Sequence, residues 1–369
     1  MKNYTTIFML LVITLLSHSA CQKTDDQTYT IPTTYNFDNV DYTGQIQRVN
    51  MLEELATYAK SANISGSNQL SAIAMINMYK NSNAPFADAS LNASTKQLKD
   101  KVAMALQAEF ENYMTAQETT SLSTNQMAMA NQAGIITSND GSQSFLLNAN
   151  GVELAQIIEK GLAAACLYYQ STIVYLGETK MNVDNKAVTD GKGTNMEHHW
   201  DEAFGYLGAP IDFPSNISNL ELWAKYSNKV NSILGCNSKI MNAFLKGRAA
   251  ISAEDYDARD EARETIKTEW EVILAAVAIS YLNDAKDSSA DPALYYHYLT
   301  EAYAFIMGLK YGASKTIADS DIDNILSNLA GSPNPLQANF YSTSMQDIDS
   351  AINAIANTFT SLEDVKASL

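Results

Sequence analysis

The chain has 369 residues, a formal net charge of −17 and a hydrophobic fraction of 46%. So large an acidic excess repels phosphate backbones, which argues against a nucleic-acid partner. The length and the hydrophobic fraction together allow either one large bundle with a sizeable core or two smaller bundles.

The amino-terminal residues have the pattern of a secretory signal. Lys2 supplies a positive charge, residues 7–16 form an apolar run too short to span a bilayer, and small residues precede Cys21. Residues 1–20 are therefore predicted to be a signal peptide. Its removal takes away Lys2 and no acid, so the net charge moves from −17 to −18.

Cys21 resembles the acylated cysteine of a bacterial lipobox, although His18 stands where such boxes usually carry leucine. The resemblance implies that residues 21–40 form a lipidated tether and that a lipid at Cys21 attaches the protein to a membrane. It also implies an outer-membrane lipoprotein, either periplasmic or surface-exposed. An ordinary secretory peptide with an incidental cysteine is the alternative.

From residue 41 onward the pattern is almost entirely helical. Apolar residues recur at steps of three and four from Gln45, and a second such run covers residues 69–79. Residues 119–145 are rich in Thr, Ser, Asn and Gly and are predicted to form a long loop, because no run has the alternation of a hairpin strand. The clearest amphipathic stripe consists of Leu98, Val102, Leu106, Phe110 and Met114.

Residues 152–175 are apolar almost all round, which predicts a helix buried at the centre of a bundle. A polar loop over 179–195 follows. Residues 220–245 are predicted to form one long helix or two helices broken near Gly235, and residues 254–285 form another. The polar loop over 179–195 is the predicted boundary between an amino-terminal half, residues 41–185, and a carboxy-terminal half, residues 186–369.

Three further signals complete the helical pattern. Asp291-Pro292 has the form of a helix cap followed by proline in the first turn. Residues 331–335 end the next helix, and residues 344–361 close the chain. The sequence therefore predicts an all-α fold of about eight to ten helices.

The cysteines carry little chemistry. A disulfide between Cys166 and Cys236 is allowed by an extracytoplasmic compartment but is not indicated by spacing. No Cys-x-x-Cys pair occurs, so a cysteine-based zinc site or redox pair is not expected.

Every histidine of the expected mature chain lies within one helical turn of a carboxylate. His198 and His199 are four and three residues before Glu202, and His297 is four residues before Glu301. Residues at these spacings meet on a helix surface. Bundles bind transition metals through such pairs on facing helices.

Joined in one site, these pairs would offer two nitrogen and two oxygen donors, a set that suits divalent Fe, Zn or Mn. Pairing of each histidine with local acids on a solvated face is the alternative. The candidate metal ligands are His199, Glu202, His297 and Glu301. The candidate supporting groups around them are His198, Asp201 and Arg48.

Residues 197–202 resemble the His-x-x-Glu core of imelysin-like proteins, with His199 and Glu202 in the motif positions and Glu197 where that family has glycine. A second resemblance covers nearly the whole mature chain. Tyr35-Asn36-Phe37, Tyr42-Thr43-Gly44-Gln45, Arg48 and residues 196–214 resemble a bacterial lipoprotein family that is known only as a domain of unknown function and is related to the imelysins.

These resemblances imply imelysin-like helical bundles, with two bundles packed at the histidine motif as one arrangement. They imply a lipid-anchored protein that binds a metal ion or an iron-containing ligand, acts in iron or haem acquisition and contacts an outer-membrane transport or surface complex.

Two other functions stay open. One is a surface accessory lipoprotein that binds glycan or peptide through aromatic residues such as Trp200, Trp223 and Trp270, with a structural histidine motif. The other is a hydrolase that uses the motif carboxylates. Catalysis has little support, because the chain lacks His-Glu-x-x-His, a Gly-x-Ser-x-Gly elbow and a phosphate-binding loop.

Overall fold

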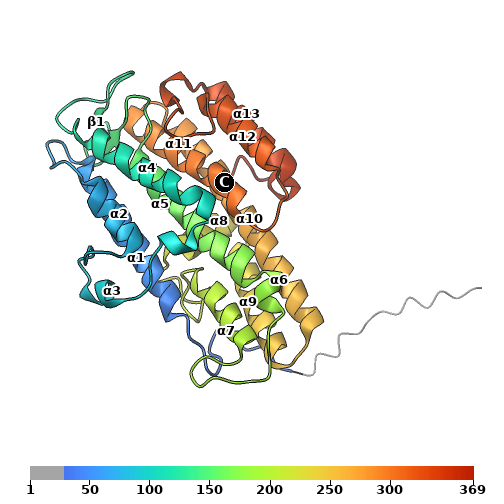
Figure 1. Cartoon of the computed structure of the whole chain (residues 1–369). Coiled ribbons are helices and arrows are strands. Elements are labelled where there is room, and N and C mark those ends of the chain that lie inside the picture. Colours follow the sequence, from blue (N-terminus) through green and yellow to red (C-terminus); the bar gives the residue numbers. More distant parts are fainter. Residues whose placement is uncertain (1–28) are drawn as a thin grey trace, which may run out of the picture.

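The computed structural model describes residues 29–369, and helices dominate it (Figure 1). This confirms the all-α prediction. The described residues contain 13 α-helices, more than the eight to ten expected. Part of the difference comes from α3 (Ala89–Ala93) and α6 (Glu178–Met181), which are too short to show a helical period in the sequence. The predicted signal peptide and Cys21 lie outside the described residues.

The first long helices are α1 (Thr43–Lys60), α2 (Ala72–Lys80) and α4 (Met104–Ser121). The predicted stripe over residues 98–114 was partly wrong, because Leu98 and Val102 precede α4. The chain forms a short 3₁₀ turn there, and Val102 is extended. Both side chains are nevertheless buried, so the apolar spacing predicted the buried positions correctly even where it did not predict the helix.

Residues 119–145 are not one long loop. α4 continues to Ser121, and β1 (Gly134–Thr137) pairs antiparallel with β2 (Ser144–Leu147). A Cβ on Gly134 would lie 2.5 Å from the carbonyl oxygen of Gln126, so only glycine fits at the start of β1. Strands of four residues are too short for an alternating pattern to stand out in the sequence.

The predicted central helix is confirmed. α5 (Leu154–Leu162) continues into two π-helical segments, η3 (Ala163–Tyr168) and η4 (Gln170–Tyr175), and most of this stretch is buried. α5 packs against α1 and α4, which come from the same half of the chain, and against α11 from the other half.

Four of the remaining helices, α8, α9, α11 and α13, pack against the longest one, α10 (Tyr256–Asp287). Gly235 has φ +62° and separates α8 from α9, which decides between the two predicted alternatives. The Asp291 carboxylate caps α11 as predicted, with Pro292 in its first turn. The other bounds are α7 (Asn195–Gly205), α8 (Leu222–Leu234), α9 (Cys236–Ser252), α11 (Pro292–Gly308), α12 (Asp319–Ala330) and α13 (Met345–Thr358).

One large hydrophobic cluster draws residues from both sides of residue 185. All three tryptophans are 0% exposed and belong to it, so they are core residues and form no exposed aromatic platform. Cys166 and Cys236 are both buried and free. Within residues 29–369, no helix combines the length and hydrophobicity needed to cross a bilayer.

Candidate ligand site at helix α7

The start of α7 is fixed by a reciprocal cap. The Thr194 hydroxyl accepts a hydrogen bond from the Glu197 backbone N–H at 3.2 Å, and the Glu197 carboxylate accepts one from the Thr194 N–H at 2.9 Å. This satisfies two backbone donors that a helix start otherwise leaves unpaired. It also aims the Glu197 side chain toward α9.

α7 packs against α9 with almost no space between them. A Cβ on Gly247 would lie 2.0 Å from the Trp200 ring, so glycine is what permits the approach. The Trp200 indole N–H donates to the Phe244 carbonyl of α9 at 3.0 Å. This contact fixes which face of α7 is buried and leaves His198, His199 and Glu202 half-buried.

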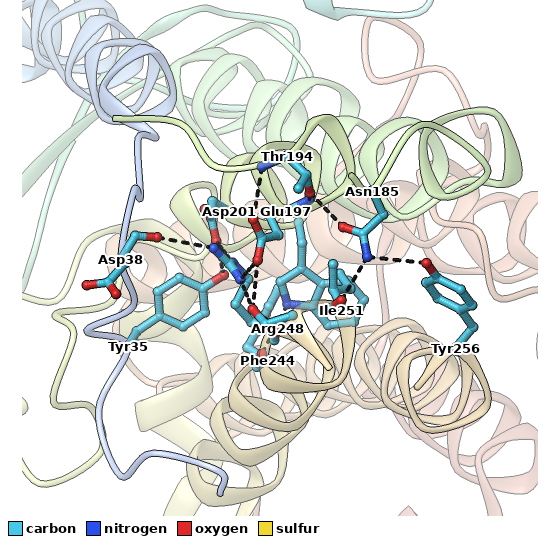
Figure 2. Close-up of polar contacts among 12 residues, drawn as sticks. Tyr35, Asp38, Asn185, Thr194, Glu197, Asp201, Phe244, Arg248, Ile251 and Tyr256 are labelled. Carbon is cyan, nitrogen blue, oxygen red and sulfur yellow. Dashed lines mark hydrogen bonds and ion pairs between the residues drawn. The ribbon is translucent and has the colours of Figure 1, made fainter. Parts of the chain in front are cut away.

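Figure 2 shows the polar network that crosses this contact. Arg248 of α9 is 1% exposed and donates to the Asp201 carboxylate at 3.0 Å and to the Glu197 carboxylate at 2.6 Å. The Tyr35 hydroxyl donates to the same Asp201 oxygen at 2.7 Å. One buried guanidinium thereby holds two acids from successive turns of α7.

The amino-terminal segment of residues 29–42, called the strap here, is held to the network by its aromatic rings. Tyr35 stacks on Phe204 with ring centroids 3.7 Å apart, and the Arg248 guanidinium lies 5.1 Å from the centre of the Phe37 ring. Arg248 also donates to the Asp38 carbonyl, as Figure 2 shows. The strap is therefore an integral part of the fold.

Burial dominates the electrostatics of this network. Burial raises the pKa of Asp201 to about 7, although Arg248 and Tyr35 both lower it. Its second oxygen is buried and has no hydrogen-bond partner among the described residues. Because Asp201 is 0% exposed and the Arg248 side chain is 1% exposed, the centre of the network is a structural junction between the strap, α7 and α9.

His199 lies on another side of α7 and has a different environment. Its Nδ1 is 3.0 Å from the Lys180 carbonyl oxygen, and its Nε2 is 3.2 Å from the Lys180 ammonium. A carbonyl only accepts, so Nδ1 carries the proton and the Nε2 lone pair faces the ammonium. Burial lowers the pKa of His199, which favours this neutral form.

Glu202 is oriented by two neighbours. Gln45 of α1 donates to its carboxylate at 2.8 Å and to the Tyr175 hydroxyl at 3.5 Å, and burial together with the Glu202 charge raises the pKa of Tyr175. Tyr175 is the last residue of the π-helical segment η4, so this unusual backbone positions it. The His198 Nε2 is 4.0 Å from Glu202, and the His198 Nδ1 is buried without a partner among the described residues.

A hollow of about 600 Å³ opens between the strap and the start of α1, beside this group. Asp41, Tyr42, Ile46 and Asp190 are among its lining residues. Burial raises the pKa of Asp41, but hydrogen bonds from Thr43 and the charge of nearby His198 lower it overall. The hollow therefore has an ionised carboxylate, that of Asp41, in its lining.

The other candidate metal ligands lie in a separate cluster. The His297 Nδ1 is 2.6 Å from Glu153 and its Nε2 is 3.5 Å from Glu301, while Lys160 is 3.3 Å from Glu301. The two carboxylates lie on opposite ring nitrogens, so they cannot share one ion with the ring. The Phe145 ring stacks on His297 with centroids 4.2 Å apart.

The structure does not bring the two histidine–glutamate pairs together. In the view of Figure 1, α7 lies at the lower end of the molecule and α11 toward the upper end. Within residues 29–369, no group of three or more histidine, cysteine, aspartate or glutamate residues is arranged to hold a metal ion.

A family model described as "Domain of unknown function (DUF4856)" matches residues 32–360. The chain belongs to this family. The match runs from the strap to α13, so both histidine clusters lie inside the family domain. No curated protein and no solved structure is similar enough to match the chain.

Membership in a family of unknown function was predicted and is confirmed, while the relation to imelysins stays a prediction. Among the supporting groups, Asp201 lies at the centre of the DUF4856 domain's buried network. Arg48 instead donates to the carbonyls of Gln97 and Gly44 and contacts no motif carboxylate through a hydrogen bond.

Two residues of the site escaped sequence reasoning. Arg248 stands directly before the apolar run Ala249-Ala250-Ile251, and a charge placed in an apolar helix face signals a buried partner of opposite sign. Lys180 precedes His199 by 19 residues and lies on a different helix, so no spacing rule connects them.

Proposed function

We propose that this DUF4856 protein is a lipid-anchored, imelysin-like binding protein of the cell envelope that takes an iron-containing ligand or a metal ion at His199 and Glu202. The observation that carries the proposal is the way His199 is held. Its Nδ1 proton is engaged by a backbone carbonyl and its Nε2 lone pair faces a cation.

This arrangement matches the support that metal-binding histidines require. Such histidines usually donate their second ring N–H to a carbonyl or carboxylate, which fixes the tautomer and the ring orientation. The ring must also be neutral to coordinate. The lowered pKa of His199 and its bond to the Lys180 carbonyl meet both conditions.

The number of donors favours a metal that arrives with ligands of its own. His199 and Glu202 provide two donor groups, whereas a closed structural zinc site uses four. An iron chelate or haem already has most of its coordination positions filled. Such a ligand would use His199 as one added donor, in keeping with a role in iron acquisition, and a bare Fe, Zn or Mn ion would bind more weakly.

In this proposal the Lys180 ammonium competes with the metal for the Nε2 lone pair of His199. The ammonium lies 3.2 Å from the Nε2 that would coordinate. Coordination therefore requires Lys180 to leave. Lys180 is half-buried at the surface, so a change of its side-chain rotamer could turn the ammonium to solvent and free the nitrogen.

The test uses tag-free protein from residue 22 onward. Zn²⁺ and Mn²⁺ are titrated by calorimetry, Fe²⁺ under anaerobic conditions, and haem by absorbance. We expect His199→Ala to abolish binding of the preferred probe, and Lys180→Met to tighten it roughly tenfold by removing a like charge.

His297→Ala is the matched control, because its cluster is separate from α7. Loss of binding in His297→Ala but not in His199→Ala would overturn the proposed site. Equal affinity of Lys180→Met and the natural protein would show that Nε2 does not coordinate.

Binding of glycan or peptide, the alternative function, stays a prediction. Because Trp200, Trp223 and Trp270 are core residues, a surface of this kind must be built from other side chains.

A further inference from the structure

A second hollow, of about 430 Å³, lies among α4, the end of α11, α12 and the loop that follows α12. We call it the α4–α12 hollow. All three helices lie in the upper half of Figure 1, away from α7. Its volume is within the range of roughly 300–1,000 Å³ typical of small-molecule sites.

One side of the hollow is apolar and aromatic. Tyr113 and Met307 are almost fully buried, and Tyr311 is half-buried between them and solvent. Burial raises the pKa of Tyr311 far above its usual value, and the charges of Tyr113, Glu109 and Asp323 raise it further. The floor is therefore apolar with hydroxyl groups at its edge.

The rim has hydrogen-bonding capacity that the protein does not use. Asn112 is exposed, and its side chain has no hydrogen bond to any described residue. The Glu109 carboxylate has one long bond, 3.5 Å, from the Tyr113 hydroxyl. The Asn334 side-chain oxygen accepts from the Leu336 backbone N–H at 3.0 Å, and its amide N–H groups donate to no described residue.

The loop that completes the rim is held in place. The Tyr303 hydroxyl donates to the Ser332 carbonyl at 2.8 Å, and the Ser332 hydroxyl accepts from the Asn334 backbone N–H at 3.1 Å. Gly331 has φ +79° and ends α12 directly before this loop. A site of this kind is preorganised, which reduces the entropy cost of binding.

The charges restrict the class of ligand. Lys310 and Asp323 neutralise each other in an ion pair, so Glu109 is the one lining acid without a cationic partner there. An anion would be repelled by Glu109 and by the acidic chain as a whole. A strongly cationic ligand would find a single free carboxylate. The ligand that best complements the charge and the lining of the hollow is therefore a neutral molecule with one apolar face and many hydroxyl groups.

We propose that the α4–α12 hollow binds a carbohydrate, with a sugar ring against the tyrosine side and its hydroxyls on Asn112, Glu109 and Asn334. The juxtaposition of an apolar floor with unpaired amide and carboxylate groups carries this inference. It is independent of the metal-binding proposal, because the site shares no residue with α7.

The experiment is a calorimetric titration of the protein from residue 22 with maltose, cellobiose and N,N′-diacetylchitobiose. We expect at least one disaccharide to saturate the protein. Asn112→Ala and Glu109→Gln, both at exposed positions, should each weaken that binding about fivefold by removing one hydrogen bond.

Asn324→Ala on α12 is the matched control, an exposed amide outside the hollow that should bind as the natural protein does. His199→Ala should also bind sugar normally. Absence of saturation by all three sugars would overturn the proposal, as would unchanged binding in both rim variants. Binding of trilysine that is lost in Glu109→Gln would overturn it in favour of a cationic ligand.

Discussion

At the scale of single residues, two histidines on one chain have opposite electrostatic environments. Burial lowers the pKa of His199, and although the hydrogen bond to the Lys180 carbonyl raises it, the charge of the Lys180 ammonium lowers it further. Burial also lowers the pKa of His297, but the charge and hydrogen bond of Glu153 and the charge of Glu301 raise it overall. Protonation therefore destabilises the folded protein at one site and stabilises it at the other.

The free energy of unfolding should reveal this difference. His199 has a lowered pKa, so its contribution is lost as pH falls from about 6.5 through that pKa. His297 has a raised pKa, so its contribution is present below about 6.5 and is lost as pH rises through the raised value. We expect His199→Gln and His297→Gln to change the slope of stability against pH in opposite directions.

Urea unfolding of both variants and the natural protein between pH 5 and 8 measures these slopes. Subtracting the free energy of unfolding of the natural protein from that of each variant removes the contribution of the carboxylates, which all three proteins share. A change of the same sign in both variants would contradict the assigned environments.

The histidines of this chain show what a sequence can say about a site. Spacing correctly brought His198 to Glu202 and His297 to Glu301, since residues four apart on a helix are neighbours. It could not supply Lys180 or Glu153, because these partners come from other elements. Contact between distant elements depends on packing, which one sequence does not display.

At the scale of elements, the junction of α7 and α9 depends on a glycine that stands opposite a tryptophan. Gly247 lies inside α9, where alanine would favour the helix by about 1 kcal/mol. The space is nevertheless occupied, since an added methyl group would lie 2.0 Å from the Trp200 ring. Overpacking of this kind typically costs about 1–3 kcal/mol.

The 2.0 Å approach puts the overpacking cost at the upper end of this range, so after the helix gain we expect Gly247→Ala to destabilise the protein by roughly 2 kcal/mol in urea unfolding. The same change should alter the tryptophan emission of the folded state. Gly235→Ala is the comparison. That position has φ +62° but nothing within 4 Å of an added Cβ, so it should cost about 1 kcal/mol without altering emission. A neutral or stabilising Gly247→Ala would show that α7 and α9 can separate without cost.

Elements with long apolar patterns were predicted well, and those without them were not. The buried stretch beginning at α5 and the capped start of α11 followed from composition and from Asp291-Pro292. The hairpin of β1 and β2 was missed because four-residue strands have too few positions for a period. The π-helical turns after α5 have the same composition as an α-helix, so no sequence pattern separates them.

At the scale of the whole molecule, one hydrophobic core contains residues from both predicted halves. The predicted lipid anchor, Cys21, lies before the described residues. The lipidation proposal rests on Cys21 and the apolar run before it. We expect the full-length natural protein to partition into the membrane fraction. Cys21→Ser should move it to the soluble fraction without changing its thermal unfolding. Retention of Cys21→Ser in the membrane fraction would exclude acylation as the means of attachment.

If Cys21 is acylated, the strap also determines which end of the protein lies nearer the bilayer. Tyr29, where the described chain begins, donates to Asp255 beside the start of α10. An acyl group on Cys21 is eight residues away, a path of at most roughly 28 Å. Because residues 29–42 are fastened to α7 and α9, the lipid would hold the α7 end near the headgroups. The α4–α12 hollow would then face outward, so the two proposed sites would meet different surroundings, one at the membrane surface and one in the open solvent.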